Sequence, residues 1–299
     1  MKHLLAYIIF SSFLFITSCS IHHTTNVESI DTIESYKSEK FQLLLDSAIS
    51  NKEQKTIFVF DIDNTVLKSE QFFGGDQWYE WINSIKQSSI EEEKYGPVPD
   101  CVFDIQALSF LLGKMSLTEN DLLNVFNTLR KNNIDFIGLT ARSPKLRYAT
   151  QRELKSNNVS FYFPNPKNVE FSAAPYPCKK ESRGCGANGL VKKLRPTSFE
   201  NGIFMVTGQN KGYLLQQLLQ QLKPRTQYNT IVFVDDKSEN IKKFSSAYAN
   251  NTEDVYSLYY THVQEHLNEN LSEKNKTKAY KTLNELIKLV QYNKNNCKI

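Results

Sequence analysis

Short runs of β-branched and aromatic residues alternate along the chain with segments of helical apolar periodicity. The runs that predict buried strands are 56–60, 134–139, 159–163, 203–206, 231–234 and 255–260. The segments that predict helices between or beside them are 38–51, 145–157, 213–222 and 239–249, followed by two C-terminal helices. Strands that alternate with helices favour an α/β fold, in which helices cover both faces of a Rossmann-like parallel sheet.

Two segments interrupt this alternation within a predicted domain of residues 38–299. From about 69 to 130 the pattern is helical, without a clear strand, and it contains Trp78 and Trp81. Packing inside a helical cap is the expected role of these aromatic side chains, and substrate contact is the alternative. Residues 164–202 are rich in Pro, Gly and Cys and predict a smaller, irregular or β insertion. Insertions of this kind can cover the strand ends, so substrate selectivity is expected to depend on them.

The first twenty residues have the pattern of an export signal. Lys2 precedes an apolar stretch at 4–16, which is shorter than the roughly 20 residues that a membrane span needs. The residues that end at Cys19 are similar to a bacterial lipobox, in which the cysteine becomes the lipidated N-terminus. Ordinary signal cleavage with full secretion is the alternative. Residues 21–37 are polar and predict a tether, so we expect a periplasmic or outer-membrane lipoprotein.

The composition is that of a soluble globular protein, with 40% hydrophobic and 23% charged residues. A net charge of +4 is small for 299 residues, and no basic block alternates with aromatics, so nucleic-acid binding has little support. Cys178 and Cys185 lie in one loop and could close a disulfide in an oxidising compartment. No Cys-x-x-Cys pair is present, which disfavours a structural zinc site.

The candidate chemistry begins directly after the run 56–60, at Asp61 and Asp63. In an extended backbone these side chains point the same way, with Cα atoms about 6.6 Å apart. Two carboxylates that close repel by roughly 2.5 kcal/mol at an effective dielectric near 20. The pair would be explained by a divalent cation between the carboxylates, or by general-acid and general-base roles that the two residues share. A calcium loop does not, because Val66 and Phe72 occupy the positions that need Gly and Glu; a solvated acidic turn is the remaining alternative.

Two further strands end in reactive residues. Thr140 follows the run 134–139, and Asp235 and Asp236 end or follow the run 231–234. Ligands of open parallel sheets bind beyond the carboxyl ends of the strands. We therefore expect these side chains and Asp61 to gather around one pocket suited to Mg²⁺.

The set of motifs resembles the haloacid dehalogenase (HAD) superfamily, and in particular a family of exported bacterial proteins known only as a domain of unknown function. The four similar motifs are Asp61-x-Asp63-x-Thr65, Thr140, Lys211 at a helix start after Gly208, and Asp235-Asp236 with Asn240 nearby. The resemblance to secreted acid phosphatases of the same superfamily is partial, because Asn64 stands where those enzymes usually have Glu.

The resemblance implies a phosphatase that hydrolyses small phosphate monoesters. Asp61 would be the nucleophile and form an aspartyl-phosphate, and Asp63 would act as general acid and then general base. Thr140 and Lys211 would bind the phosphoryl group, although Thr140 could instead cap a helix and Lys211 could be solvated. Arg142 could reach a phosphate, or cap a helix, or form a salt bridge. The expected magnesium ligands are Asp61, the backbone carbonyl of Asp63, Asp235 and, more weakly, Asp236.

Two other classes of function are compatible with parts of the sequence. A HAD scaffold can lose turnover and serve as a surface binding protein or effector. The segment from His262 to His266 matches the His-x-x-Glu-His pattern of inverted zinc proteases, and on a helix both histidines would share a face. The alternative interpretation is a pair of surface histidines that bind no metal.

Overall fold

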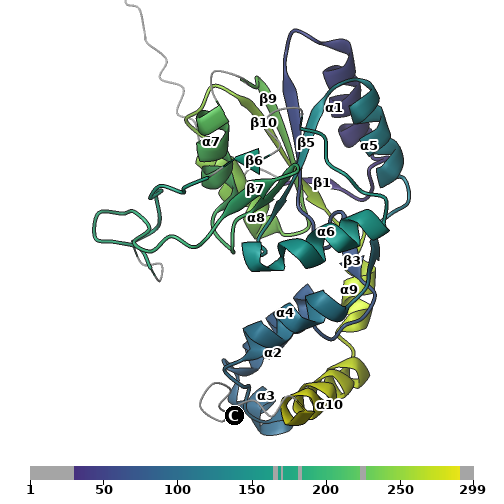
Figure 1. Ribbon diagram of the computed structural model, residues 1–299, viewed down its shortest axis with the longest axis vertical. Helices are drawn as coiled ribbons and strands as arrows, with labels where there is room; N and C mark the ends of the chain where they lie inside the picture. The colour runs from purple at the N-terminus through teal and green to yellow at the C-terminus, as the bar shows by residue number, and fades with distance from the viewer. Residues whose placement is uncertain (1–29, 164–167, 170, 181–183, 223–226, 290–299) are drawn as a thin grey trace, which may run out of the picture.

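The computed structural model describes residues 30–163, 168–169, 171–180, 184–222 and 227–289, and its centre is a mostly parallel sheet (Figure 1). The strand order among the described residues is β1-β10-β9-β2-β5-β8-β7-β6. The first six strands run parallel, whereas β7 is antiparallel to β8 and β6 is antiparallel to β7. In sequence order the bounds are β1 Asp31–Ile33, β2 Thr56–Phe60, β5 Asp135–Thr140, β6 Asn168–Val169, β7 Ser198–Glu200, β8 Ile203–Met205, β9 Thr230–Asp235 and β10 Asp254–Tyr260. The predicted α/β fold class is confirmed.

Helices cover both faces of this sheet because alternate residues of the central strand β2 point to opposite sides. Phe58 and Phe60 pack in one apolar cluster with α1, α5 and α6, while Ile57 and Val59 pack in another with α7 and α8. All four side chains are fully buried, which explains the uninterrupted apolar run. The helix bounds are α1 Glu39–Ser50, α5 Leu122–Lys131, α6 Arg147–Ser156, α7 Lys211–Leu222 and α8 Ser238–Tyr248.

A cap of helices lies beside the carboxyl edge of the sheet (Figure 1). It contains α2 Asp76–Ile85, α3 Ser89–Tyr95 and α4 Val102–Leu112. Its stem is a pair of antiparallel strands, β3 Leu67–Ser69 and β4 Met115–Leu117. Trp78 and Trp81 are buried in the apolar core of the cap, so packing is their role in this structure.

The last helix completes the cap although it comes from the other end of the chain. After the short helix α9 Gln264–Asn270, α10 Glu273–Leu289 places Ala279 and Leu283 in the same apolar cluster as the tryptophans. Tyr280 also donates a hydrogen bond from its hydroxyl to the carbonyl of Pro97, at 2.9 Å. The cap is therefore built from two distant segments.

The structure corrects several predicted boundaries. The cap does not extend to residue 130, because α5 packs on the sheet: the ring of Phe126 lies 5.1 Å from that of Phe60 and 4.9 Å from that of Phe136. The predicted insertion also contains a strand, β4. The predicted tether 21–37 is too long, because β1 pairs with β10 within it.

The run 159–163 is not a strand. Only an isolated antiparallel bridge joins Tyr162 to Phe136. The insertion predicted at 164–202 contributes β6 and β7 to the sheet, and its middle is irregular. In the described part of the chain, no helix combines the length and the apolar composition of a membrane-spanning segment.

Candidate active site

Three adjacent parallel strands bring the predicted residues to one edge of the sheet. In the order β9-β2-β5, Phe60 of β2 is in register with Val234 of β9 and with Gly138 of β5. The backbone N–H of Asp61 donates to the carbonyl of Val234 at 2.9 Å, which fixes the chain where β2 ends. The strand ends with Asp61, Thr140 and Asp235 therefore lie side by side, as the sequence pattern predicts.

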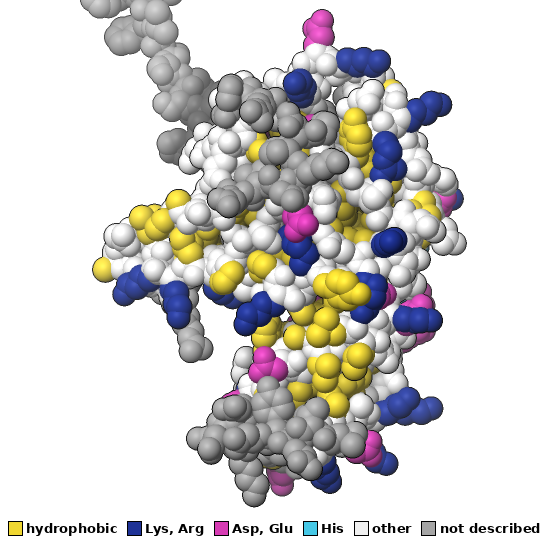
Figure 2. Space-filling view, in the orientation of Figure 1, with side chains coloured by type: hydrophobic (Ala, Val, Ile, Leu, Met, Phe, Trp, Pro, Cys, Tyr) yellow, Lys and Arg dark blue, Asp and Glu magenta, His cyan; other side chains and the backbone are white. Residues whose placement is uncertain are grey.

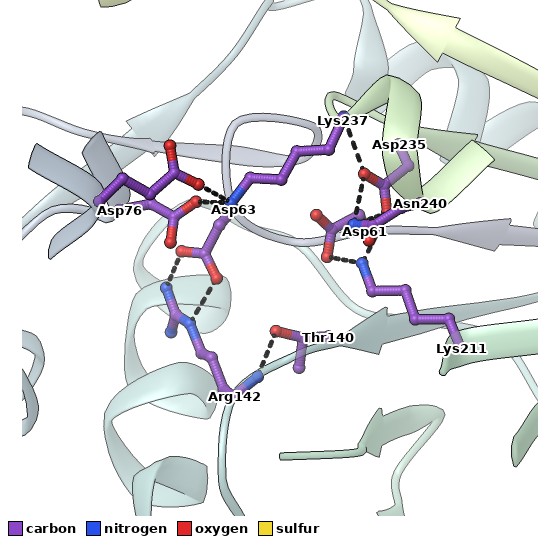
Figure 3. Close-up of polar contacts among 10 residues, drawn as sticks. Asp61, Asp63, Asp76, Thr140, Arg142, Lys211, Asp235, Lys237 and Asn240 are labelled. Atoms are coloured by element: carbon purple, nitrogen blue, oxygen red, sulfur yellow. Dashed lines mark hydrogen bonds and ion pairs between the residues drawn. The ribbon is translucent and has the colours of Figure 1, made fainter. Parts of the chain in front are cut away.

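Lys211 joins two of these aspartates (Figure 3). Its Nζ lies 2.6 Å from Oδ1 of Asp61 and 2.7 Å from Oδ2 of Asp235. The lysine side chain is 4% exposed, so it is not a solvated residue at a helix start. The two carboxylates raise the pKa of Lys211 against the lowering effect of its burial. The lysine thus remains positively charged and neutralises part of the aspartate charge.

Asp235 is held on several sides. Nδ2 of Asn240 donates to both carboxylate oxygens at 3.0 Å, and the backbone N–H of Lys237 donates to Oδ1 at 2.9 Å. Asp235 is fully buried. Its carboxylate is consequently fixed by groups that follow it in the chain as well as by Lys211.

Asp236 completes a group of three carboxylates. One oxygen each from Asp61, Asp235 and Asp236 lies within 4.8 Å of the others, and all three residues are buried. Oδ1 of Asp236 is buried without a hydrogen-bond partner. A hard divalent cation prefers such oxygen ligands, and an unpartnered buried oxygen is costly without one. The residues present therefore fit Mg²⁺, and Asp236 has a stronger place in the site than the sequence indicated.

The charge state of the group reflects its burial. Burial raises the pKa of Asp61 from 3.8 to about 7; Lys211 opposes this shift, and Asp235 and Asp63 add to it. Burial also raises the pKa of Asp236 well above its usual value, with further contributions from Asp235 and Asp61. A bound cation would favour the ionised carboxylates and so lower both pKa values.

The Asp63 carboxylate points away from this group and forms a bidentate pair with Arg142 (Figure 3). Nε of the arginine donates to Oδ2 at 2.9 Å and Nη2 donates to Oδ1 at 2.6 Å. Of the roles that the sequence leaves open for Arg142, the structure shows the salt bridge. The side chain of Arg142 is 4% exposed, so the pair is shielded from water.

Arg142 also contacts the stem of the cap. Its Nη2 lies 3.0 Å from Sδ of Met115 in β4, and its guanidinium lies 4.2 Å from the ring centre of Phe110 in α4. Within the core, Nη1 donates to Oγ1 of Thr150 at 2.9 Å. The residue that holds Asp63 is therefore fixed partly by the cap.

Thr140 is fully buried at the end of β5, and its Oγ1 accepts a hydrogen bond from the backbone N–H of Arg142 at 3.1 Å. It does not cap the helix that follows, because that short 3-10 turn, Pro144–Leu146, has Ser143 at its cap position. The hydroxyl hydrogen of Thr140 is thus not used by this contact and remains able to donate.

A second connection between cap and core was not predicted from the sequence. Nζ of Lys237 forms ion pairs with Asp76, at 2.6 Å, and with Glu80, both in α2 (Figure 3). Burial raises the pKa of Asp76, although Lys237 acts in the opposite direction. The sequence gives only a weak signal for this contact. A lysine directly after Asp235-Asp236 is an ordinary residue at a helix start, and its ion-pair partners can be identified only when the position of the cap is known.

The segment from His262 to His266 does not resemble a zinc site. Helix α9 begins only at Gln264, so the two histidines do not share one helical face. Nδ1 of His262 lies 3.1 Å from the carbonyl oxygen of Glu34, and Nε2 of His266 lies 3.2 Å from Nδ2 of Asn270. Among the described residues, the group suited to a metal is the aspartate trio, which contains neither histidine.

The structure also joins Cys178 and Cys185 in a disulfide, as the spacing suggested. Cys19, the predicted lipidation site, and the export signal at 1–20 lie outside the described residues. Their roles remain predictions.

Together the fold and the site define an α/β protein with three buried aspartates and a lysine at the carboxyl edge of its sheet, beside a helical cap. The sequence matches the family described as "Protein of unknown function (DUF2608)" over residues 40–292, and the chain belongs to this family. A comparison with curated proteins finds no match.

Two solved structures are similar to most of the chain at low identity. One is a class C acid phosphatase from Bacillus anthracis with tungstate bound, at 15% identity and a TM-score of 0.35, covering 80% of this chain and 83% of the other. Another is a HAD family hydrolase from Salmonella enterica subsp. enterica serovar Typhi, at 12% identity and a TM-score of 0.32, covering 79% and 83%. At these TM-scores the likeness carries no argument about function.

Proposed function

We propose that the protein is an exported, Mg²⁺-dependent phosphatase that hydrolyses small phosphate monoesters through an aspartyl-phosphate. The observation that supports this most directly is the meeting of Asp61, Asp235 and Asp236 around one buried point next to Lys211. A phosphate ester resists attack because an anionic nucleophile must approach an anion. A site for carboxylate attack therefore needs concentrated positive charge, and this arrangement is suited to provide it.

In the first step, an oxygen of Asp61 attacks phosphorus and the bond from phosphorus to the leaving oxygen breaks. Asp63 gives a proton to that oxygen, so the alcohol leaves neutral. Lys211 neutralises charge on Asp61 and stays protonated. The Thr140 hydroxyl would donate to a phosphoryl oxygen. Mg²⁺ held by Asp61, Asp235 and Asp236 would supply further positive charge beside the phosphoryl group.

In the second step, water attacks the phosphorus of the aspartyl-phosphate, and Asp63 accepts its proton. The phosphorus–oxygen bond to Asp61 breaks and the free carboxylate returns. In the structure both oxygens of Asp63 accept from Arg142. Arg142 uses one lone pair of each oxygen, so a second lone pair is left for the proton, and the cap contacts of Arg142 connect the position of Asp63 to that of the cap.

The test is turnover of p-nitrophenyl phosphate by the mature protein with Mg²⁺. We expect EDTA to abolish turnover, and Asp61→Asn to reduce it by at least about a thousandfold. Asp46→Asn is the matched control, because Asp46 is an exposed aspartate of α1. Equal rates for wild type and Asp61→Asn would reject the nucleophile. Mg²⁺ binding without any turnover would instead favour the catalytically silent binding protein.

Export is a separate part of the proposal. It is supported by the charged start, short apolar stretch and terminal cysteine of residues 1–20. Expression in a bacterium with a labelled fatty acid tests it. We expect label on the wild type but not on Cys19→Ser. Unlabelled wild type that is cleaved and released would favour ordinary secretion.

A further inference from the structure

The segment between β6 and β7 contains a strongly basic arm, defined here as the described residues 171–180 and 184–197. These residues include five Lys or Arg residues and no acid, which gives a net charge of +5 in a chain whose total is +4. All five cations are exposed, and none of them forms an ion pair in the described part of the chain: Lys179, Lys180, Lys192, Lys193 and Arg195. The arm is therefore a dense group of exposed, unpaired positive charges; the Lys-rich segment that begins at Lys274 is the other basic part of the sequence.

The arm is fastened to α7 rather than loosely attached. The backbone N–H and carbonyl of Ala174 make hydrogen bonds with the side chain of Gln217, at 2.7 and 3.0 Å. The buried ring of Tyr176 stacks on that of Tyr213, with centres 5.5 Å apart. The disulfide closes the loop beyond Tyr176. Because these contacts hold the arm in place, its exposed lysines form a charged surface with a fixed position.

The C-terminal end of the arm lies beside the loop that leads into the candidate active site. Nη2 of Arg195 donates to the carbonyl of Gly208 at 3.0 Å, and the side-chain amide of Gln209 donates to the carbonyl of Arg195 at 2.9 Å. Gly208 and Gln209 belong to the loop that leads into Lys211. An anionic body bound along the arm would consequently lie next to the same edge of the sheet.

The same face of the molecule exposes apolar side chains where α4 meets α6 (Figure 2). Arg152 of α6 joins the two helices by donating from Nη2 to the carbonyls of Phe110 and Gly113, both at 3.1 Å. Around this seam Leu112 is 77% exposed and Tyr148 is 73% exposed. Leu111 of α4 is exposed as well, whereas the exposed ring of Phe103 lies against Tyr79 of α2 and is not part of the seam. Large apolar side chains grouped on a surface mark an interaction site.

We propose that the basic arm and the α4–α6 seam form one face that docks on an anionic phospholipid surface. Exposed lysines are attracted by anionic headgroups, and apolar side chains beside them gain by entering the interfacial layer. A single-stranded nucleic acid fits the basic arm less well, because its bases need aromatic rings beside the positive charges, and the arm's Phe171 and Tyr176 pack on the core. The inference does not depend on the proposed phosphatase activity.

The test is sedimentation with lipid vesicles, using the mature chain from Ile21. The described fold begins at Ile30, and the apolar stretch at 4–16 would bind lipid by itself. We expect binding to phosphatidylglycerol-containing vesicles at low salt, weak binding at high salt, and none to pure phosphatidylcholine vesicles. The arm variant replaces four lysines by glutamate: Lys179, Lys180, Lys192 and Lys193. The control variant makes the same charge change on exposed lysines of other elements: Lys52, Lys131, Lys242 and Lys278.

We expect the arm variant to bind anionic vesicles about a hundredfold more weakly, and the control to change binding by about threefold or less. A second variant, Leu111→Ser with Leu112→Ser, should weaken binding about tenfold. Far-UV circular dichroism and thermal melting curves check that each variant is folded. Equal losses in the arm and control variants would overturn the proposal, as would equal binding to neutral vesicles. Unchanged binding of the leucine variant, with loss of a dimer, would assign the seam to a second copy of the chain.

Discussion

Without a divalent cation, the protein should become less stable as the pH rises from about 5 to 8, because the folded site holds a proton on Asp61 that the unfolded chain releases. Paired surface aspartates normally produce the opposite trend. The perturbation is removal of metal with EDTA, and the reference is Asp61→Asn, which has nearly the same shape but cannot ionise. The difference between the two proteins isolates the contribution of Asp61 from other titrating groups.

The magnitude follows from the raised pKa of Asp61. Burial moves this pKa from 3.8 to about 7, and the side chain is only 7% exposed, so water screens the effect little. A folded-state pKa above the unfolded value contributes stability that is complete below the unfolded pKa and is lost as the pH rises through the folded one. A shift of about three units corresponds to about 4 kcal/mol in total, of which roughly 2–3 kcal/mol falls between about pH 5 and pH 8. The raised pKa of Asp236 acts in the same direction.

The assay is denaturant unfolding of both proteins in EDTA across this pH range, followed by the same series with Mg²⁺. In EDTA the wild type should lose about 2–3 kcal/mol relative to Asp61→Asn as the pH rises. With Mg²⁺ the trend of the wild type should flatten or reverse, because metal ligands must be deprotonated and the ion binds only the folded state.

Parallel pH profiles for the wild type and Asp61→Asn in EDTA would refute the assignment of a buried, proton-holding Asp61. A wild type that Mg²⁺ does not stabilise at any pH would refute the aspartate trio as a cation site. The two results are independent, so charge burial and metal binding are tested separately.

Three further predictions concern the surroundings of the site. Asp63→Asn should reduce kcat/KM for an alkyl phosphate at least about tenfold more than kcat/KM for p-nitrophenyl phosphate, because only the poor leaving group needs the proton of Asp63; equal losses for the two substrates would contradict this role. Lys237→Met should raise KM about threefold to tenfold with a small loss of stability, because a partly exposed ion pair to the cap contributes little to folding; steady-state kinetics and melting curves measure both. Replacing Cys178 and Cys185 by serine should cost about 2–3 kcal/mol of unfolding free energy through the loop they close, with unchanged kcat in the same assays.

The site could be predicted from the sequence to the extent that it depends on strand order and strand ends. Asp61, Thr140 and Asp235 follow apolar runs, and parallel strands deliver their carboxyl ends to one edge whatever lies between them. The directions of the side chains could not be predicted in the same way. An extended backbone suggested that Asp61 and Asp63 act together, but the regular strand ends at Phe60 and Asn64 has a positive φ of 60°. The chain turns there, and the two carboxylates find different partners.

The boundaries that were predicted wrongly are those set by tertiary contacts. The apolar periodicity of α5 is equally suited to a helix in the cap and to a helix on the sheet. The ring contacts of Phe126 with Phe60 and Phe136 place it on the sheet. Strand β1 is three residues long and its sequence, Asp-Thr-Ile, has little apolar signal. Helix α10 joins the cap from almost 200 residues away along the chain from α2, and no local pattern reports such a contact.

Two different cations hold the two acidic side chains that follow β2, so Asp61 and Asp63 are positioned separately. Lys211 approaches Asp61 from the core helix α7, whereas Arg142 reaches Asp63 from the loop after β5 and touches the cap through Phe110. The lysine contact is fixed by the sheet and should persist whatever the cap does. The arginine contact is shared with the cap. In the proposed mechanism, Asp61 is therefore positioned by the core and Asp63 partly by the cap, which would connect the insertion to proton transfer as well as to covering the substrate.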